Sequence, residues 1–393
     1  MVDTPPDQKT QQAPTLVGLF WAFLQLGATA FGGPAMIPYI RKAATEKNNW
    51  LKADAFKHGL ALCQAIPGAT AMQMAAYVGL KVRGVPGAIC TYVGFGLPAF
   101  LLMLALSAVY SRSHGLPTVL AVFSGLQAII VAVTANATIS FGRTTLKSVS
   151  TILIALVATG LFLLKLNPVF IILVAGLLGI LFNHRGVVEG NNSEPEEPTS
   201  TVLPLTLMLL VSAVGFLVLF LVRKDLFHLA VLIARIDLVS FGGGFASIPL
   251  MFHEIVDVRA WLDAQTYLNG IALGQFTPGP IVITATFVGF MTKGLLGAVV
   301  ATIAVFLPSF VLLVGVAPWF DRVRHSPWVS HAVGGILCSF VGLLFTVTLR
   351  FAGEVHWDWR HLALAVAALT ALLNDVDLPW VVLPGTAISA FMF

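Results

Sequence analysis

About thirteen apolar segments, most of them long enough to cross a lipid bilayer, run through this chain from residue 15 to its last residue. A membrane-spanning helix needs about 20 mostly apolar residues, because the hydrocarbon core of a bilayer is about 30 Å thick. Only 10% of the 393 residues are charged, whereas soluble domains carry about 25%. Since lipid offers no hydrogen bonds to an exposed backbone, segments of this kind fold as helices. The sequence therefore predicts an all-α polytopic membrane protein.

A single long hydrophilic stretch divides these segments into two groups. It has the proline- and glutamate-rich composition of a flexible connector. The expected spans are 15–40, 58–80, 85–110, 118–140, 149–164, 167–182, 203–222, 226–250, 268–290, 294–317, 330–350, 361–374 and 379–393. The expected organisation is a polar tail (1–14), a first unit (15–182), a hydrophilic linker (183–202), a connecting span (203–222) and a second unit (226–393).

The second unit repeats the first. The sequence QAIPGAT at 64–70 returns as QFTPGPI at 275–281, and VGLKVRGVPGA at 78–88 returns as VGFMTKGLLGA at 288–298. The offset stays at 210 or 211 over about 75 residues. A register kept for this long indicates an internal duplication.

An odd number of crossings separates the starts of the two copies. Six expected spans and the connecting segment 203–222 make seven, so the second copy begins on the opposite side of the membrane. Two inverted-topology repeats, related by a pseudo-two-fold axis in the membrane plane, are characteristic of secondary transporters. A count that is wrong by one span would make the repeats parallel instead. Lysine and arginine divide almost evenly between the two sets of loops, so the positive-inside rule does not fix the orientation.

Glycine and proline interrupt matched apolar segments in both copies. Broken helices within a membrane are tolerated where the freed backbone groups line a hydrated cavity inside the protein. The positive end of a helix that restarts there suits an anion. A single break is more often a simple kink, but four matched breaks favour a binding site. They consist of Gly32 and Gly33, Gly242 and Gly243, Pro67 and Gly68, and Pro278 and Gly279.

Uncharged polar side chains gather around the same breaks. Such donors can coordinate a tetrahedral oxyanion without placing a full charge inside the bilayer, although they can also only join helices to one another. Gln64 and Gln275 are equivalent, each three residues before its Pro-Gly pair. The candidate side chains are Gln64, Thr70, Gln73, Gln275 and Thr277.

Arg235 is the one basic residue in the interior of an expected span, six residues before Phe241. A charge at this depth is costly unless it faces a cavity or a partner, so we predict that Arg235 binds the anion. The alternative is a side chain that reaches back to the membrane surface.

Other classes of function lack support in the sequence. No basic stripe interleaved with aromatic residues predicts nucleic-acid binding. His253 and Glu254 begin a zinc-protease pattern, but Asp257 stands where the second histidine belongs. No nucleophile–base pair stands out, so an enzyme is the weakest hypothesis. We expect no catalytic residue, no metal and no cofactor.

The compound pattern FGGP, WL, QxxPG, GxxxxGxxGA and LP, present in two copies, resembles the chromate ion transporter family in its long two-domain form. The resemblance implies export of chromate across the bacterial inner membrane, driven by an ion gradient or by exchange, with sulfate as a related substrate. It also implies thirteen spans in antiparallel halves, surrounded by membrane lipid. Many members read PGPEA where this chain has Pro67-Gly68-Ala69-Thr70-Ala71. The missing acid leaves sulfate or another oxyanion open as the substrate; an oxyanion channel and a homodimer also stay open.

Overall fold

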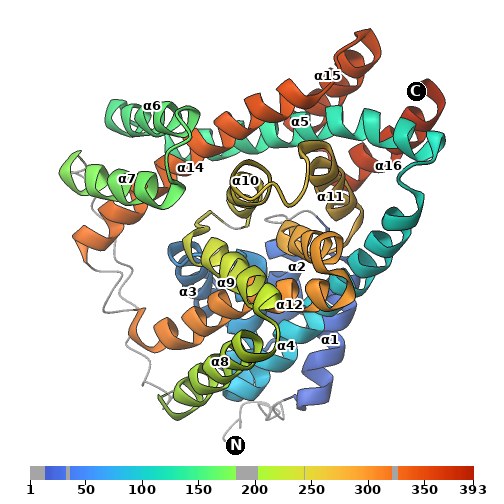
Figure 1. Ribbon diagram of the computed structural model, residues 1–393. Helices are drawn as coiled ribbons and strands as arrows, with labels where there is room; N and C mark the ends of the chain where they lie inside the picture. The colour runs from blue at the N-terminus through green and yellow to red at the C-terminus, as the bar shows by residue number, and fades with distance from the viewer. Residues whose placement is uncertain (1–13, 32–35, 183–201, 243, 321–325) are drawn as a thin grey trace, which may run out of the picture.

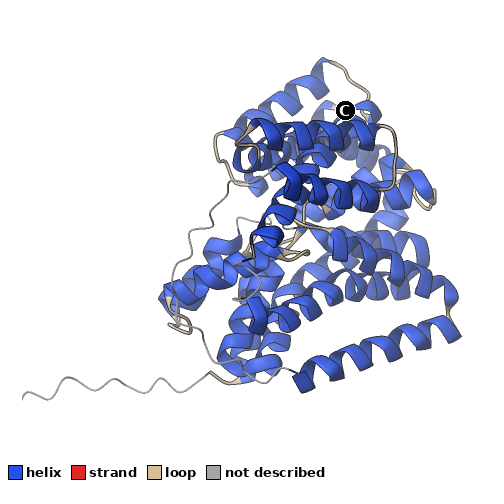
Figure 2. Ribbon diagram, turned by 90° about the vertical axis from the view of Figure 1, so that its left-hand side faces the viewer, coloured by secondary structure: helices blue, strands red, loops and turns tan. Residues whose placement is uncertain are grey.

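The computed structural model describes residues 14–31, 36–182, 202–242, 244–320 and 326–393, and within them it contains helices and no strand (Figure 1, Figure 2). The all-α class is therefore confirmed. The first repeat consists of α1 (Leu16–Thr29), α2 (Met36–Arg41), the π-helical η2 (Lys42–Lys47), α3 (Ala53–Ala65), α4 (Thr70–Ser113), α5 (Pro117–Thr145), α6 (Val149–Leu163) and α7 (Pro168–Phe182). The connecting helix is α8 (Val202–Val222).

The second repeat has the same order of elements. It consists of α9 (Lys224–Val239), α10 (Ser247–Phe252), the π-helical η3 (His253–Val258), α11 (Ala264–Phe276), the short 3₁₀ helix η4 (Ile281–Ile283), α12 (Thr284–Val316), the 3₁₀ helix η5 (Ala317–Trp319), α14 (Pro327–Glu354), α15 (Trp359–Leu373) and α16 (Leu378–Met392). Two copies of one helical unit therefore flank α8, which confirms the predicted repeat.

The expected spans with glycine or proline breaks are divided in the structure. The span 15–40 is divided into α1 and α2, and 226–250 into α9 and α10. The Pro-Gly breaks separate α3 from α4 and α11 from α12. The prediction of broken helices at matched positions is confirmed, because glycine and proline remove the hydrogen bonds and the rigidity that continue a helix.

The long helices α4 and α12 each turn back on themselves at a glycine. Gly84 and Gly294 adopt φ angles of +64° and +66°, which glycine reaches without a steric penalty. The reversal brings Gly79 directly against the carbonyl of Gly87, where a Cβ would overlap it. The expected boundary between spans 58–80 and 85–110 is therefore a tight turn between two closely packed helical segments.

The two repeats exchange their last two helices. The helices α6 and α7 pack on α14 of the second repeat, and α15 and α16 pack on α5 of the first (Figure 1). The equivalent helices α5 and α14 also pack on each other, as do α4 and α12. The hydroxyls of Thr138 and Thr348, equivalent by 210 residues, lie 3.3 Å apart. Equivalent residues in mutual contact mark the pseudo-two-fold axis of the inverted repeats.

Apolar surface on the outside of the bundle shows where lipid lies. Five helices, α4, α5, α8, α12 and α14, are long and apolar enough to cross a membrane by length and composition. Most leucines and valines of α8 are exposed; Leu207, Leu210 and Val211 are 60%, 63% and 65% exposed, while Phe216 and Leu219 pack against the bundle. A helix that is apolar all round is stable in this position only against hydrocarbon. The protein is therefore a multi-pass membrane protein.

Candidate functional site

The four helix breaks meet at the contact between the two repeats. The backbone N–H of Gly68 donates a hydrogen bond to the carbonyl of Ser240 at 2.8 Å, and the equivalent N–H of Gly279 donates to Ala30, also at 2.8 Å. Each Pro-Gly break is thus bound to the end of the first helix of the other repeat. These two amides are already occupied, so an anion at this junction would be bound by other groups.

The conformation of the junction explains why glycine stands at each Pro-Gly break. Gly68 and Gly279 have φ angles of +116° and +109°, a region that other residues rarely adopt. A Cβ on Gly68 would overlap the side chain of Ser309, and one on Gly279 would lie 2.7 Å from the Cβ of Ala99. Ser309 and Ala99 are themselves equivalent, so the same close approach is built twice.

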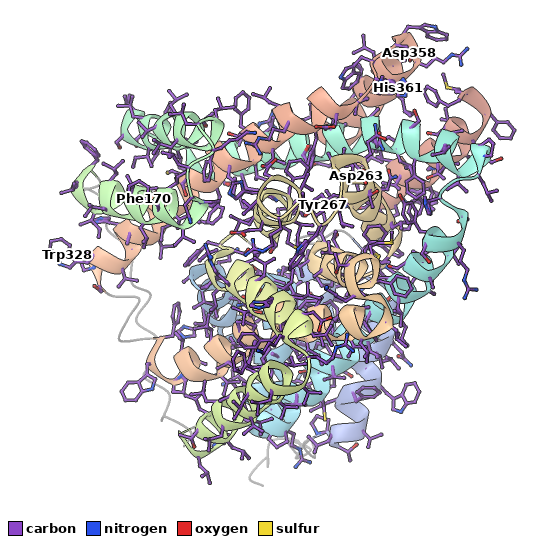
Figure 3. The ribbon with its side chains drawn as sticks, viewed as in Figure 1. Phe170, Asp263, Tyr267, Trp328, Asp358 and His361 are labelled. Atoms are coloured by element: carbon purple, nitrogen blue, oxygen red, sulfur yellow. The ribbon has the colours of Figure 1, made fainter. Side chains whose placement is uncertain are left out.

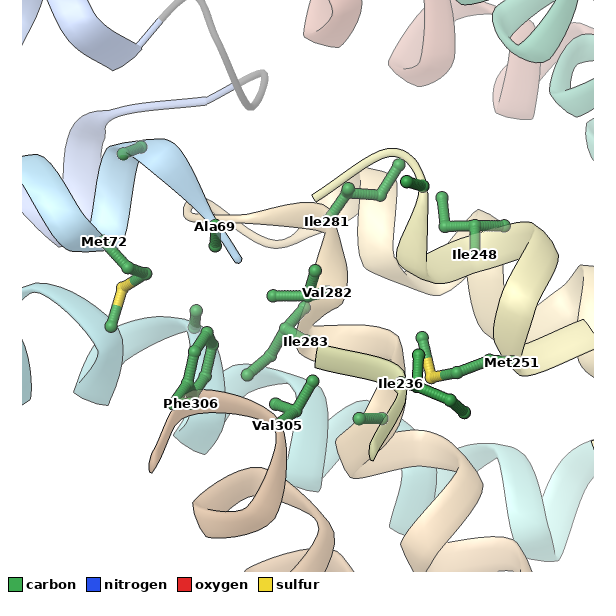
Figure 4. Close-up of a cluster of buried hydrophobic side chains, with 14 of the residues drawn as sticks. Ala69, Met72, Ile236, Ile248, Met251, Ile281, Val282, Ile283, Val305 and Phe306 are labelled. Carbon is green, nitrogen blue, oxygen red and sulfur yellow. The ribbon is translucent and has the colours of Figure 1, made fainter. Parts of the chain in front are cut away.

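Apolar side chains pack tightly around the junction (Figure 4). Figure 4 shows Ala69 and Val282, one from each repeat, near each other, with Met72 to the left of Ala69 and Phe306 below. All four are buried, with at most 7% of their surface exposed. The glycines of the two Pro-Gly breaks therefore lie among buried apolar side chains.

Three predicted residues of the second repeat line a small cavity beside the junction. The cavity has a volume of about 10 Å³ and is lined by Phe245, Gly274, Gln275, Thr277, Gly279, Ile281 and Leu378. Gln275 is 5% exposed and Thr277 is 2% exposed. A space of this size holds roughly one water molecule. An oxyanion with four oxygens would need the cavity to open.

In the first repeat, Gln73 supports the break. Its Nε2 donates to the carbonyl of Pro67 at 2.6 Å, while its Oε1 is buried without a hydrogen-bond partner among the described residues. Thr70 is the first residue of α4 and is half-buried. Pro67, Gly68, Thr70 and Gln73 therefore lie within one helical turn of the break, as the sequence spacing implies.

The remaining predicted break residues are placed only in part. Gly242 adopts a φ angle of +88° between α9 and α10, and Pro278 is buried between α11 and η4. Gly32, Gly33 and Gly243 lie outside the described residues.

The two copies of the Pro-Gly break are covered unequally. In the second repeat α11 packs on α5 and α16 as well as on α12, whereas α3 packs mainly on α4. Gln64 is consequently exposed, while its equivalent Gln275 is buried. One side of the junction is therefore open and the other closed.

The open side of α3 carries a polar stripe. Asp54, Lys57, Ala61 and Gln64 follow one another at helical spacing, are all exposed, and end beside the break at Pro67. A stripe facing lipid would carry large aliphatic residues, because charged groups are costly in hydrocarbon. The stripe therefore faces water and leads from the surface of the protein to the break. On α11 the corresponding Leu268, Ala272 and Gln275 are buried.

Hydrogen bonds, two of them between the repeats and one within the second repeat, hold the closed side together. Gln127 of α5 donates to Oδ1 of Asn269 at 2.9 Å, and Asn269 donates to the hydroxyl of Tyr110 at 3.0 Å. The buried hydroxyl of Tyr267 donates to the carbonyl of Ile248 at 2.7 Å, which ties α11 to α10. Figure 3 shows Tyr267 within the bundle on α11. These bonds hold α11 against α4, α5 and α10.

Arg235 has a carboxylate partner. Its Nη2 lies 3.7 Å from Oε1 of Glu254 in η3, and its side chain is 46% exposed. Glu254 also pairs with Arg259, so two arginines share one carboxylate and leave an excess positive charge. No contact places Arg235 beside the cavity of Gln275, and its role in anion binding stays a prediction.

One polar residue of this region, Asp237, was not among the predicted site residues. It is completely buried in α9, and its Oδ2 accepts a hydrogen bond from the backbone N–H of Ser309 at 2.8 Å. Of the 18 acidic residues in the sequence, Asp237 is the one within an expected span. This isolated position within an apolar segment could have identified Asp237 from the sequence, because an intramembrane carboxylate usually has a function.

Comparison with known proteins gives a consistent result for both repeats. The sequence profile described as chromate transporter matches residues 17–180 and, a second time, residues 227–390. No solved structure matches the chain.

Individual relatives cover most of the chain. An uncharacterized transporter of Methanocaldococcus jannaschii is 38% identical over 94% of this chain and 92% of its own length. The chromate transport protein of Cupriavidus metallidurans is 30% identical over 95% of this chain and 92% of its own length. A probable chromate transport protein of Synechococcus elongatus is 32% identical over 82% of this chain and 81% of its own length.

Proposed function

The chain belongs to the chromate transporter family, and from this premise we propose that it is a secondary transporter of a tetrahedral divalent oxyanion, with chromate as the first candidate. Export from the cell across the bacterial inner membrane, driven by an ion gradient or by exchange, is the direction that we propose. Sulfate has the same charge and shape and is the related substrate.

The unequal covering of the two repeats is the observation that carries this proposal. In an inverted-repeat transporter, each repeat adopts in turn the conformation of the other, which opens the central site to alternate sides. Here α3 presents Gln64 to water while α11 buries Gln275. Exchange of these two arrangements would expose Gln275 and cover Gln64. An open channel would need no such difference between its halves.

The chemistry near the breaks supports an oxyanion. Gln64, Gln275 and Thr277 bring amide and hydroxyl donors, and the restarting helices α4 and α12 direct the positive ends of their dipoles at the junction. Arg235 and Arg259 share the single carboxylate of Glu254, so this group carries a net positive charge. Donors of this kind bind the oxygens of a tetrahedral anion. An apolar substrate would leave them without hydrogen-bond partners.

Counterflow tests the proposal directly. Purified protein in liposomes loaded with unlabelled chromate should take up labelled chromate, and parallel liposomes should be tested with sulfate and molybdate. Uptake that saturates and depends on internal anion supports a transporter, while single-channel currents would favour an oxyanion channel. Uptake equal to that of empty liposomes for all three anions would refute the proposal. The oligomeric state, including a homodimer, is to be measured on the same preparation.

A further inference from the structure

Asp237 is a carboxylate buried inside the bundle, and the described residues place no cation beside it. None of its surface is exposed, and it lies three residues before the break at Ser240. Its Oδ2 accepts the backbone N–H of Ser309, and its Oδ1 has no hydrogen-bond partner among the described residues. The ion pairs that the structure describes near α9 do not include it.

The groups that face Asp237 are uncharged. Tyr92 from α4 directs its hydroxyl to the carbonyl of Phe306 at 2.8 Å and to the hydroxyl of Ser309 at 3.3 Å. The thiol of Cys63 in α3 is also buried. The helices α8 and α10, which pack on α9, carry no titratable side chain.

The nearest charged side chains are directed elsewhere. Lys293 of α12 reaches Asp225 at the beginning of α9, at a distance of 4.0 Å. Arg235 lies two residues from Asp237, about 200° around the helix, and pairs with Glu254. Because a lone charge is expensive in a dry interior, a buried carboxyl without a cation is stable when it holds a proton.

The position of Asp237 connects this proton to the junction between the repeats. The carbonyl of Ser240, on the same helix end, accepts the N–H of Gly68. A Cβ on Gly68 would also overlap Ser309, whose amide binds Asp237. A change of charge on Asp237 therefore acts on the backbone that joins α9 to the Pro-Gly break of the first repeat.

The first repeat has no counterpart of this carboxyl. The equivalent residue is Gly27, and a Cβ there would overlap the carbonyl of Phe95. The close packing of α1 on α4 leaves no room for a carboxylate. The chain therefore contains a single buried carboxyl of this kind within the described residues, and the site is asymmetric.

We propose that Asp237 is the proton carrier of the transporter and couples one proton to each transport cycle. When the site opens to one side, the carboxylate takes one proton from water and becomes neutral; when it opens to the other side, the carboxyl returns that proton to water. The neutral form permits the closed junction in the half of the cycle that carries the proton, and the protein crosses without this proton in the other half, so one proton moves per cycle. The inference rests on the proposed transport function and names its coupling ion.

The test compares Asp237→Asn with the wild type in liposomes that contain a pH-sensitive dye. The asparagine resembles the protonated carboxyl in shape and charge, so the variant should retain chromate counterflow. It should lose accumulation driven by a pH gradient, together with the proton movement that the dye reports. Asp225→Asn, the same change at the exposed beginning of α9, is the matched control and should keep both activities.

The outcomes are distinguishable from failure of transport itself. No counterflow by the wild type refutes the proposed function. Accumulation by Asp237→Asn with wild-type pH dependence, loss of its counterflow in a well-folded preparation, or dependence on sodium in place of protons overturns the role of Asp237. If Asp237→Asn does not fold, Asp237→Glu keeps a titratable group one methylene further out and should shift the pH profile of accumulation. An unchanged profile in that variant would equally overturn the proposal.

Discussion

The side-chain amide of Gln127 donates a hydrogen bond to Asn269 at 2.9 Å, so a helix of the first repeat holds the broken helix of the second in its covered position. We expect Gln127→Leu to loosen α11, because a buried acceptor left without a donor costs about 1–3 kcal/mol. A cysteine at Gln275, in a chain without its native cysteines, should then react faster with a membrane-impermeant thiol reagent. Thr144→Val, on an exposed part of α5, is the control and should leave the rate unchanged. An equal rate in both variants would show that this bond does not hold α11.

Labelling of the two equivalent glutamines tests the open and closed sides. In the same cysteine-free background, Gln64→Cys should react readily with the impermeant reagent, because the polar stripe of α3 faces water. Gln275→Cys should be protected, because its side chain is 5% exposed. Addition of chromate on the closed side should raise the second rate if the repeats exchange conformations. Similar rates at both positions without substrate would contradict the asymmetry.

Two alanine substitutions compare the importance of a glycine at the junction with that of a glycine in an open turn. Gly68→Ala should abolish transport and destabilise the protein, because its Cβ overlaps Ser309 in addition to the strained φ angle. Gly84→Ala has a comparable backbone strain, about 1–3 kcal/mol, but its Cβ meets open space. It should lower the thermal stability and keep transport. Thermal unfolding and counterflow on the same samples check both, and active Gly68→Ala would remove the junction from the mechanism.

Substitutions of Arg235 and of Glu254 should change the apparent KM for chromate in opposite directions. Arg235→Gln removes a positive charge that we predict to bind the anion and should raise the apparent KM for chromate about tenfold, a loss of roughly 1.4 kcal/mol. Glu254→Gln releases both arginines from their shared carboxylate and should lower the KM. Initial uptake rates at several chromate concentrations measure both. If the two variants raise the KM equally, Arg235 has only a structural role in its ion pair with Glu254 and does not bind the anion.

Glycine should contribute to stability where α7 of the first repeat packs on α14 of the second. Gly335 of α14 lies against Gly179 of α7, and a Cβ on it would overlap the carbonyl of Ala175. We expect Gly335→Ala to reduce stability by about 1–3 kcal/mol through overpacking. Gly353→Ala on the same helix meets open space and should be neutral or slightly stabilising. The yield of monodisperse protein and the thermal unfolding temperature distinguish the two variants.

Much of the architecture follows from local sequence patterns. Twenty-residue apolar segments are helices because lipid leaves their backbone no other partner. Pro67-Gly68 and Pro278-Gly279 interrupt their helices because neither residue supports helical hydrogen bonding and rigidity. The duplication is visible because equivalent positions, such as Gln64 and Gln275, keep one register. These features depend on residues close together in the chain, so the sequence alone determined them.

The tertiary structure decided what these segments contact. No local pattern predicts that α6 and α7 pack on α14, that Gly68 binds Ser240, or that Asp237 meets the amide of Ser309. The same holds for Gln64 and Gln275, which stand at equivalent positions three residues before a Pro-Gly pair but have opposite exposure. The covered position of α11 depends on contacts between residues more than 100 positions apart, such as Gln127 with Asn269. Local sequence does not reveal such contacts, because the packing of distant segments is decided by the tertiary structure and not by neighbours along the chain.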